Sequence, residues 1–325
     1  MEKRRHITHG FGFHKKKGMK FNAVLNALLT TVYTSNVITV KGVPIASAIS
    51  IAGGTYSKNG GGYTASAGTV SPGDTVSVRG TSSGADSTLV TVTLTIATLT
   101  LLFKVTTGDH VPNAFSFVDI NPGLLSTIYT SNTIVVTGTT IPSVISISGA
   151  GATYNINGGA FTASAGTVNP SDNVQVKNTS SASDTTVVNS ALTIGGVSDT
   201  FTITTGDHVP TAFSFVDQTN VALSTAIISA PITVAGITIP SVISISGGGG
   251  DYRINGGSFT ASAGTVNNGD TVEARVTSSG APSTGVSTTV TIGGISDTFT
   301  ATTTGGGGGT TGTSMGLLLA LTYPT

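Results

Sequence analysis

One short motif in this chain has the residue types and spacing of a catalytic nucleophile. The pentapeptide Gly312-Thr-Ser314-Met-Gly316 matches the G-x-S-x-G pattern. A serine of that pattern needs a strand before it, a helix after it and a base within hydrogen-bond reach. Ser314 instead follows a run of five glycines at 305–309. We therefore predict that Ser314 is not catalytic.

The histidines offer little more. His110 and His208 each follow an aspartate in a repeated TTGDHVP stretch. Neighbouring side chains of an extended chain point to opposite sides, so Asp109-His110 is not expected to form an acid–base pair. His6, His9 and His14 lie in a basic leader without helical spacing or an acidic partner, which indicates a solvated charge run rather than a metal site. Because CxxC, HExxH and phosphate-binding patterns are also missing, we predict no catalytic residues, no enzyme and no organic cofactor.

The acidic residues around the repeated TTGDHVP stretch are the one candidate binding constellation. Carboxylate oxygens are the ligands that Ca²⁺ prefers, and a bound ion would stiffen a junction between domains. No DxDxDG loop accompanies them, and the alternative is that they cap turns by accepting bonds from local backbone N–H groups. The candidate calcium ligands are Asp109, Asp119, Asp207 and Asp217.

Composition indicates an all-β protein. Among 325 residues there are 44 glycines, no cysteine and no tryptophan, and only 9% are charged. Val, Ile and Thr, which favour strands, are abundant, and disulfides are excluded. The net charge of zero hides a basic leader, since seven of the fourteen Lys and Arg lie in the first twenty residues. The rest is mildly acidic and carries no basic stripe, which argues against nucleic-acid binding.

An internal repeat organises the chain. The stretches TYSKNGGGYTASAGTV, TYNINGGAFTASAGTV and DYRINGGSFTASAGTV place Tyr56, Tyr154 and Tyr252 at intervals of 98 residues. A fixed period of this kind indicates tandem copies of one structural unit. The predicted parts are a basic flexible leader at 1–18, modules at 19–108, 113–206 and 211–304, and a glycine-rich linker with a short apolar tail at 305–325.

Each module reads as a series of short strands. Alternation in Ile145-Ser-Ile147 predicts a strand with one buried face, as does FTASAGTV at 161–168. Asn157-Gly158 is suited to a hairpin turn with positive φ. Phe161 and Val168 are expected in the core, and Tyr154 is expected to pack across the hairpin. Asp74, Asp172 and Asp270 recur in a turn, and a turn role is expected for them.

Seven or eight such strands in about 98 residues is the strand count of an immunoglobulin-like (Ig-like) β-sandwich. The predicted fold class is all-β, with three tandem Ig-like β-sandwich modules in an elongated array and flexible N- and C-terminal tails. The runs AFSFVDQTNVALST and ALTIGGVSDTFTITT, together with the repeated NGG hairpin, resemble the Ig-like modules repeated in tandem in large bacterial surface and adhesin-like proteins. The resemblance implies an extracellular, structural or adhesive role.

The first module departs from the others. Where they carry GGVSDTF and GGISDTF, it carries ATLTLLF at 97–103, and we expect it to be less regular. The stretch 14–33 has the basic start and apolar run of a signal peptide, but it aligns with the first strands of the second module, so no export signal is evident. The apolar run near the C-terminus has about seven residues against the roughly 20 of a membrane span. It is either a relic anchor signal or a frayed tail.

These observations favour a non-enzymatic, rod-like spacer or presenting module at a bacterial cell surface, with other surface or matrix components as partners. A self-associating filament or matrix subunit, built by strand addition between neighbours, is a second hypothesis. Its candidate donor is LLLALTY near the C-terminus or the apolar strand of the first module. A carbohydrate-binding module is a third, although few aromatic residues are available for a sugar platform.

Overall fold

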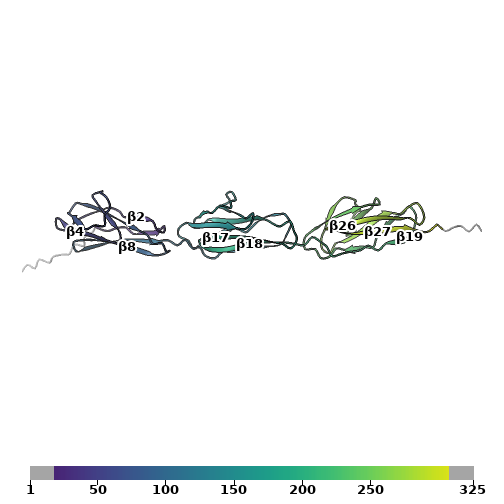
Figure 1. Cartoon of the computed structure of the whole chain (residues 1–325), viewed down its shortest axis with the longest axis horizontal. Helices are drawn as coiled ribbons and strands as arrows, with labels where there is room; N and C mark the ends of the chain where they lie inside the picture. Colours follow the sequence, from purple (N-terminus) through teal and green to yellow (C-terminus); the bar gives the residue numbers. More distant parts are fainter. Residues whose placement is uncertain (1–17, 307–325) are drawn as a thin grey trace, which may run out of the picture. The chain divides into compact units, whose positions relative to one another are not determined.

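The computed structural model of the chain describes residues 18–306, which form 27 strands and no helix (Figure 1). Each of the three repeats forms one five-stranded and one four-stranded sheet. The predicted class, all-β with three tandem Ig-like sandwiches, is confirmed. The predicted leader and tail lie outside the described residues, except for Gly18 and for 305–306.

The nine strands of each repeat have nearly the same lengths in all three. The first repeat has β1 (Val24–Ala27), β2 (Val32–Thr34), β3 (Ile38–Thr39), β4 (Ser47–Ala52), β5 (Thr55–Lys58), β6 (Gly68–Val70), β7 (Thr75–Thr81), β8 (Leu89–Ile96) and β9 (Leu99–Thr107). The second has β10 (Ile120–Gly123), β11 (Ile128–Thr130), β12 (Ile134–Val135), β13 (Ser143–Ser148), β14 (Thr153–Ile156), β15 (Gly166–Val168), β16 (Asn173–Thr179), β17 (Val187–Ile194) and β18 (Val197–Thr205). The third has β19 (Gln218–Val221), β20 (Ala226–Ile228), β21 (Ile232–Thr233), β22 (Ser241–Ser246), β23 (Asp251–Ile254), β24 (Gly264–Val266), β25 (Thr271–Thr277), β26 (Gly285–Ile292) and β27 (Ile295–Thr303).

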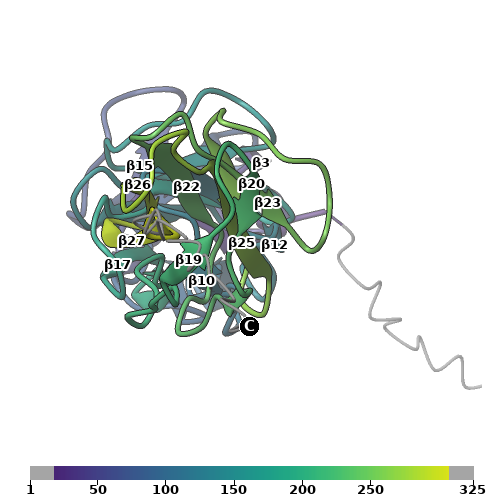
Figure 2. The same ribbon diagram turned by 90° about the vertical axis from the view of Figure 1, so that its right-hand side faces the viewer.

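The larger sheet of the first repeat has the order β1-β9-β8-β4-β6, and the other two repeats follow the same order. In the smaller sheet β7 is central. Arg79 pairs with both β2 and β5, and Val76 pairs with both β3 and β5. Strands β2 and β3 therefore lie along one edge of β7, and β5 lies along the other. Figure 2 shows the two layers in the third repeat, with β22, β26 and β27 on one side and β20, β23 and β25 on the other.

The first and last strands of every repeat run parallel, whereas neighbours such as β4 and β8, or β8 and β9, are antiparallel. Val24 of β1 is opposite Val105 of β9, and Ala27 is opposite Thr107. The same parallel pairing joins β10 to β18 and β19 to β27, each with a register shift. In each repeat the chain thus enters the larger sheet at one end and leaves it at the other.

A tyrosine and a phenylalanine fill corresponding places in each core. Tyr154 is 2% exposed, and its hydroxyl donates to the backbone oxygen of Ser164 at 2.8 Å. Tyr56 and Tyr252 make the equivalent bonds to Ser66 and Ser262. Phe103, Phe201 and Phe299 are fully buried at the same position of each last strand. The packed, hydrogen-bonded tyrosine agrees with the sequence-based prediction for Tyr154.

The hairpin turns have the backbone geometry that the sequence predicts. Asn157 and Gly158 have φ values of 52° and 73°. Positive φ at both central residues defines a turn whose twist matches that of the flanking strands. The turn between β8 and β9 survives in the first repeat without its glycines, with Ala97 at φ 51°. The first repeat has the same strand order as the other two, so its topology is not irregular as the sequence led us to expect. Eight residue pairs between β8 and β9 form the hairpin.

Two sequence-based expectations about strands are wrong. Within 161–168 only Gly166–Val168 is a strand, preceded by an isolated bridge between Thr162 and Tyr154. Val168 is buried as predicted, but Phe161 is only half-buried, and the ammonium of Lys177 lies 4.0 Å from its ring centre. Phe161 is outside the core because the chain crosses the sandwich between Thr162 and Gly166 instead of continuing as one strand.

The described chain divides into two compact units. One contains the residues up to Asp119 together with Tyr129–Asn178 and Asn189–Thr202. The other contains Ile120–Ile128, Thr179–Val188 and the residues from Ile203 onward. Each linker between successive repeats lies within one unit, so its contacts can be described locally.

Candidate functional site

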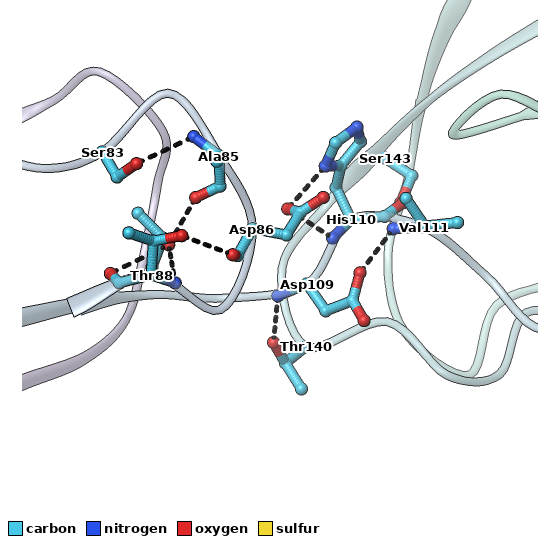
Figure 3. Close-up of polar contacts among 10 residues, drawn as sticks. Ser83, Ala85, Asp86, Thr88, Asp109, His110, Val111, Thr140 and Ser143 are labelled. Carbon is cyan, nitrogen blue, oxygen red and sulfur yellow. Dashed lines mark hydrogen bonds and ion pairs between the residues drawn. The ribbon is translucent and has the colours of Figure 1, made fainter.

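The linker between the first and second repeats is hydrogen-bonded on both sides. The backbone N–H of Gly108 donates to Ala27 at 3.0 Å. The N–H of Asp109 donates to the hydroxyl of Thr140 at 2.8 Å (Figure 3). The backbone oxygen of Asp109 accepts from the N–H groups of Thr140 and Ile141. The second linker repeats these bonds with Asp207, Thr238 and Ile239. The linkers are therefore part of the folded structure.

The histidine of each linker also pairs with an aspartate in a loop of the preceding repeat, a pair that the sequence analysis missed. The Asp86 carboxylate lies 2.7 Å from Nδ1 of His110 and accepts the backbone N–H of His110 at 3.2 Å (Figure 3). Asp184 and His208 form the same pair, with 2.6 Å to Nδ1. A carboxylate that orients an imidazole is part of a hydrolytic triad. The hydroxyl of Ser143, however, donates to the backbone oxygen of His110 rather than to its ring, so it is not placed as a nucleophile.

The third repeat shows that the pair belongs to junctions. Pro282 and Gly306 stand 98 residues after Asp184 and His208, so both partners are replaced together. This joint replacement is the signal by which a comparison of the copies could have found the pair. The pair is present at the two junctions between directly adjacent repeats and is replaced where the glycine run 305–309 follows, which indicates that it serves the connection and not the interior of the module.

Each linker also seats an isoleucine of the repeat that follows. Ile141 is 5% exposed and lies against Gly108, where a Cβ atom would come within 2.7 Å of the Thr140 hydroxyl. Ile239 lies against Gly206 in the same way. The corresponding residue of the first repeat, Ile45, is 83% exposed and follows Pro44 in place of a threonine.

The four aspartates proposed for calcium lie in two different settings. Asp109 and Asp207 accept the N–H groups of Val111 and Val209, two residues on, at 2.9 Å. Asp119 accepts the N–H of Thr202, and Asp217 that of Thr300, both at 2.8 Å. Within residues 18–306, no three Asp, Glu or His side chains come together as a metal-binding group. Each of the four carboxylates thus accepts a backbone N–H, from a residue two positions on for Asp109 and Asp207 and from the last strand of the repeat for Asp119 and Asp217.

Hydrogen bonds to the turn aspartates Asp74, Asp172 and Asp270 lower the pKa of each. Asp74 accepts bonds from the Asn59 side chain and the Ser71 N–H, both at 2.8 Å, and Lys58 lies 3.0 Å away. These interactions, the Asn59 bond foremost, lower the pKa of Asp74 from 3.8 to about 2. Backbone and asparagine bonds likewise lower the pKa of Asp172 and Asp270. The expected turn role is confirmed.

The outer face of the smaller sheet carries different charged residues in the three copies. A cation stacks on an aromatic ring in every repeat, with Arg79 over Tyr63, Lys177 over Phe161 and Arg275 over Phe259. The third repeat adds two ion pairs here, from Arg253 to Glu273 and from Arg275 to Asp251. The first repeat instead pairs Lys58 of β5 with the turn aspartate Asp74. The shared stacking is structural, and the variable charges give each repeat a different surface.

Comparisons with known proteins find solved structures with a distant likeness to this chain. No protein-family model and no curated protein matches the sequence. Among solved structures, the I9–I11 tandem of titin covers 89% of this chain and 98% of its own at 14% identity, with a TM-score of 0.39. Invasin, a bacterial integrin-binding protein, covers 85% and 58% at 11% identity and a TM-score of 0.35. An endo-fucoidan hydrolase of glycoside hydrolase family 107 covers 89% and 44% at 12% identity and a TM-score of 0.24.

The fold defines a class: this chain is a tandem Ig-like β-sandwich repeat protein. In this chain three copies of the sandwich are joined by hydrogen-bonded Gly-Asp-His linkers. No helix of sufficient length and apolar character to cross a membrane occurs between residues 18 and 306.

Proposed function

We propose that the chain is a non-enzymatic structural and adhesive repeat protein of a bacterial cell surface. It would act as a spacer, or present a binding module, while the chain is under tension. The sequence resemblance to tandem modules of bacterial surface proteins supports the location. The partners would be other cell-surface or matrix components, bound by the copy-specific charges of the smaller sheets.

The parallel pairing of terminal strands carries the proposal. Because β1 and β9 run in the same direction, a pull on the two ends of the first repeat slides one strand along the other. The hydrogen bonds between them lie across the direction of the pull and are loaded together. An antiparallel hairpin pulled at its open end would instead lose its bonds one at a time. All three repeats share this parallel arrangement.

The linkers support the same function. Gly108 and Asp109 bond to both neighbouring repeats, and the Asp86–His110 pair adds a third connection. A pull is thereby passed from one sandwich to the next through ordered structure.

Single-molecule force spectroscopy of the chain tests the proposal. We expect three unfolding events, each releasing about 30 nm of chain, since an extended residue spans about 3.5 Å. The chain has no cysteine, so pairs of introduced cysteines can set the points of attachment. Pulling at Ser287→Cys and Thr300→Cys, which face each other across β26 and β27, should need a much lower force. Equal forces for both geometries would contradict a role under tension.

The surface location has its own test. Antibodies raised against the third repeat should label intact cells of the source bacterium, and added protease should remove that label. Labelling only after cell lysis would contradict the proposal.

A further inference from the structure

The first repeat lacks two carboxylate bonds that close one edge of the larger sheet in the other repeats. In the second repeat, Asp199 accepts the N–H of Phe117 at 2.7 Å and Asp119 accepts the N–H of Thr202 at 2.8 Å. These bonds fasten the segment before β10 to the last strand. Asp297 and Asp217 make the same two bonds in the third repeat.

Apolar residues replace both aspartates in the first repeat. Leu101 stands at the position of Asp199, and Ala23 stands at the position of Asp119. Neither side chain can accept a hydrogen bond. A groove of about 550 Å³ lies here between the segment before β1 and strand β9. Its lining includes Met19, Lys20, Phe21, Leu101, Leu102 and Lys104.

The groove exposes a strand edge. Strand β1 pairs with β9 only at Val105 and Thr107, and the other edge of β9 is taken by β8. Over Leu99–Lys104, the edge facing the groove has no strand partner among the described residues. Leu102 is 44% exposed beside it. An unpaired edge with apolar side chains is a template for strand addition.

The length of the open edge and the charges beside it indicate which segment could add to it as a strand. The edge offers six residues, or about 20 Å of strand, and the segment LLLALTY at 317–323 would span about 23 Å at 3.3 Å per residue. That segment is uncharged and apolar. The N-terminal leader, with Lys15, Lys16 and Lys17, would be repelled by Lys20 and Lys104 at the groove.

We propose that the open edge of β9 accepts residues 317–323 of a second copy of the chain as an added strand, so that the chain assembles head to tail. In the second and third repeats the carboxylates fasten the preceding segment to the last strand and take up the N–H groups of Thr202 and Thr300, so the first repeat is the acceptor among the three described repeats. This assembly is separate from the proposed role under tension, since either can hold without the other.

The experiment combines sedimentation velocity of the full chain at rising concentration with binding of a labelled peptide of residues 314–325. The wild type should form larger species as its concentration rises. Leu318→Asp with Leu319→Asp in the donor, and Ala23→Asp with Leu101→Asp in the acceptor, should each abolish them. The acceptor variant restores the carboxylates of the other repeats and should bind the peptide at least about tenfold more weakly, a loss of about 1.4 kcal/mol. Leu89→Asp, at a leucine 51% exposed on β8, is the matched control and should assemble normally.

Several outcomes would overturn the proposal. These are a wild type that stays monomeric at all concentrations, donor variants that assemble like the wild type, and assembly that is lost only when residues 1–17 are deleted. Tail-dependent protection of the groove without any change in mass would show that the tail binds its own chain. The donor variants leave every residue of the three described sandwiches unchanged, so they test the proposal even if the acceptor variant fails to fold.

Discussion

Replacing Asn157 should destabilise the second repeat by an amount that depends on the new residue. The Asn157 side chain donates to Asp172 at 2.7 Å and accepts the N–H of Asn173 at 2.9 Å, and its φ is 52°. Each lost hydrogen bond costs about 1 kcal/mol. A residue with a Cβ but no local bonding group pays a further 1–2 kcal/mol or so in this left-handed conformation. Asn157→Ala should therefore cost about 3–4 kcal/mol, and Asn157→Gly about 2 kcal/mol.

Calorimetry of the full chain measures both changes. In a chain of similar repeats, Asn157→Ala should move one of three unfolding transitions to lower temperature and leave two in place. Asn157→Gly should move the same transition by a smaller amount. The corresponding variants at Asn59 and Asn255 should act in the same way on the other two repeats, because they make the same pair of bonds.

The difference between the two variants is the decisive quantity. If Asn157→Ala were no more destabilising than Asn157→Gly, the positive φ would not be a cost, and the turn would not have the geometry described. If neither variant moved a transition, the bonds to Asp172 and Asn173 would contribute nothing measurable.

Three further predictions concern acid, the linkers and calcium. The folded-state pKa of Asp74 is about 2 against an ordinary 3.8, so its contribution to stability is complete above about pH 4 and is lost as the pH falls toward 2. Urea unfolding at a series of pH values should show this loss of stability, and Asn59→Ala should make the loss smaller. Gly108→Ala should weaken the first junction by about 1–3 kcal/mol through overpacking against Thr140, detected as faster proteolysis of the linker, whereas Gly62→Ala, with open space around it, should have no effect. The calcium proposal for Asp109, Asp119, Asp207 and Asp217 predicts a higher melting temperature in Ca²⁺ than in EDTA, and equal values would favour their role as turn and strand caps.

The repeated hairpin was predictable because its determinants are local. Asn157-Gly158 sets the turn, and the alternation in Ile145-Ser-Ile147 marks a strand with a buried face. The partial burial of Phe161 could not be predicted in the same way, because it depends on Lys177 from a neighbouring strand and on where the chain crosses the sandwich.

The Asp86–His110 pair was hidden for a related reason. Its members lie 24 residues apart, on a loop and a linker, whereas the aspartate next to His110 in the chain is Asp109. A sequence shows directly which residues are chain neighbours. Partners that meet across a loop can be found only when both are replaced in another copy, as Asp184 and His208 are by Pro282 and Gly306. The candidate groove of the first repeat was predictable only as a loss of pattern at 97–103.

The packing of Ile141 against Gly108 limits how repeats can be added to or exchanged within such an array. A copy can follow another only if it brings the isoleucine and threonine that fit the preceding linker, and it can be followed only if it supplies the aspartate and histidine. The first repeat, with Pro44 before the exposed Ile45, meets only the second requirement, and the third repeat meets only the first. Duplication of the middle repeat would therefore lengthen the array with intact junctions, whereas exchanging the first and third repeats would break both.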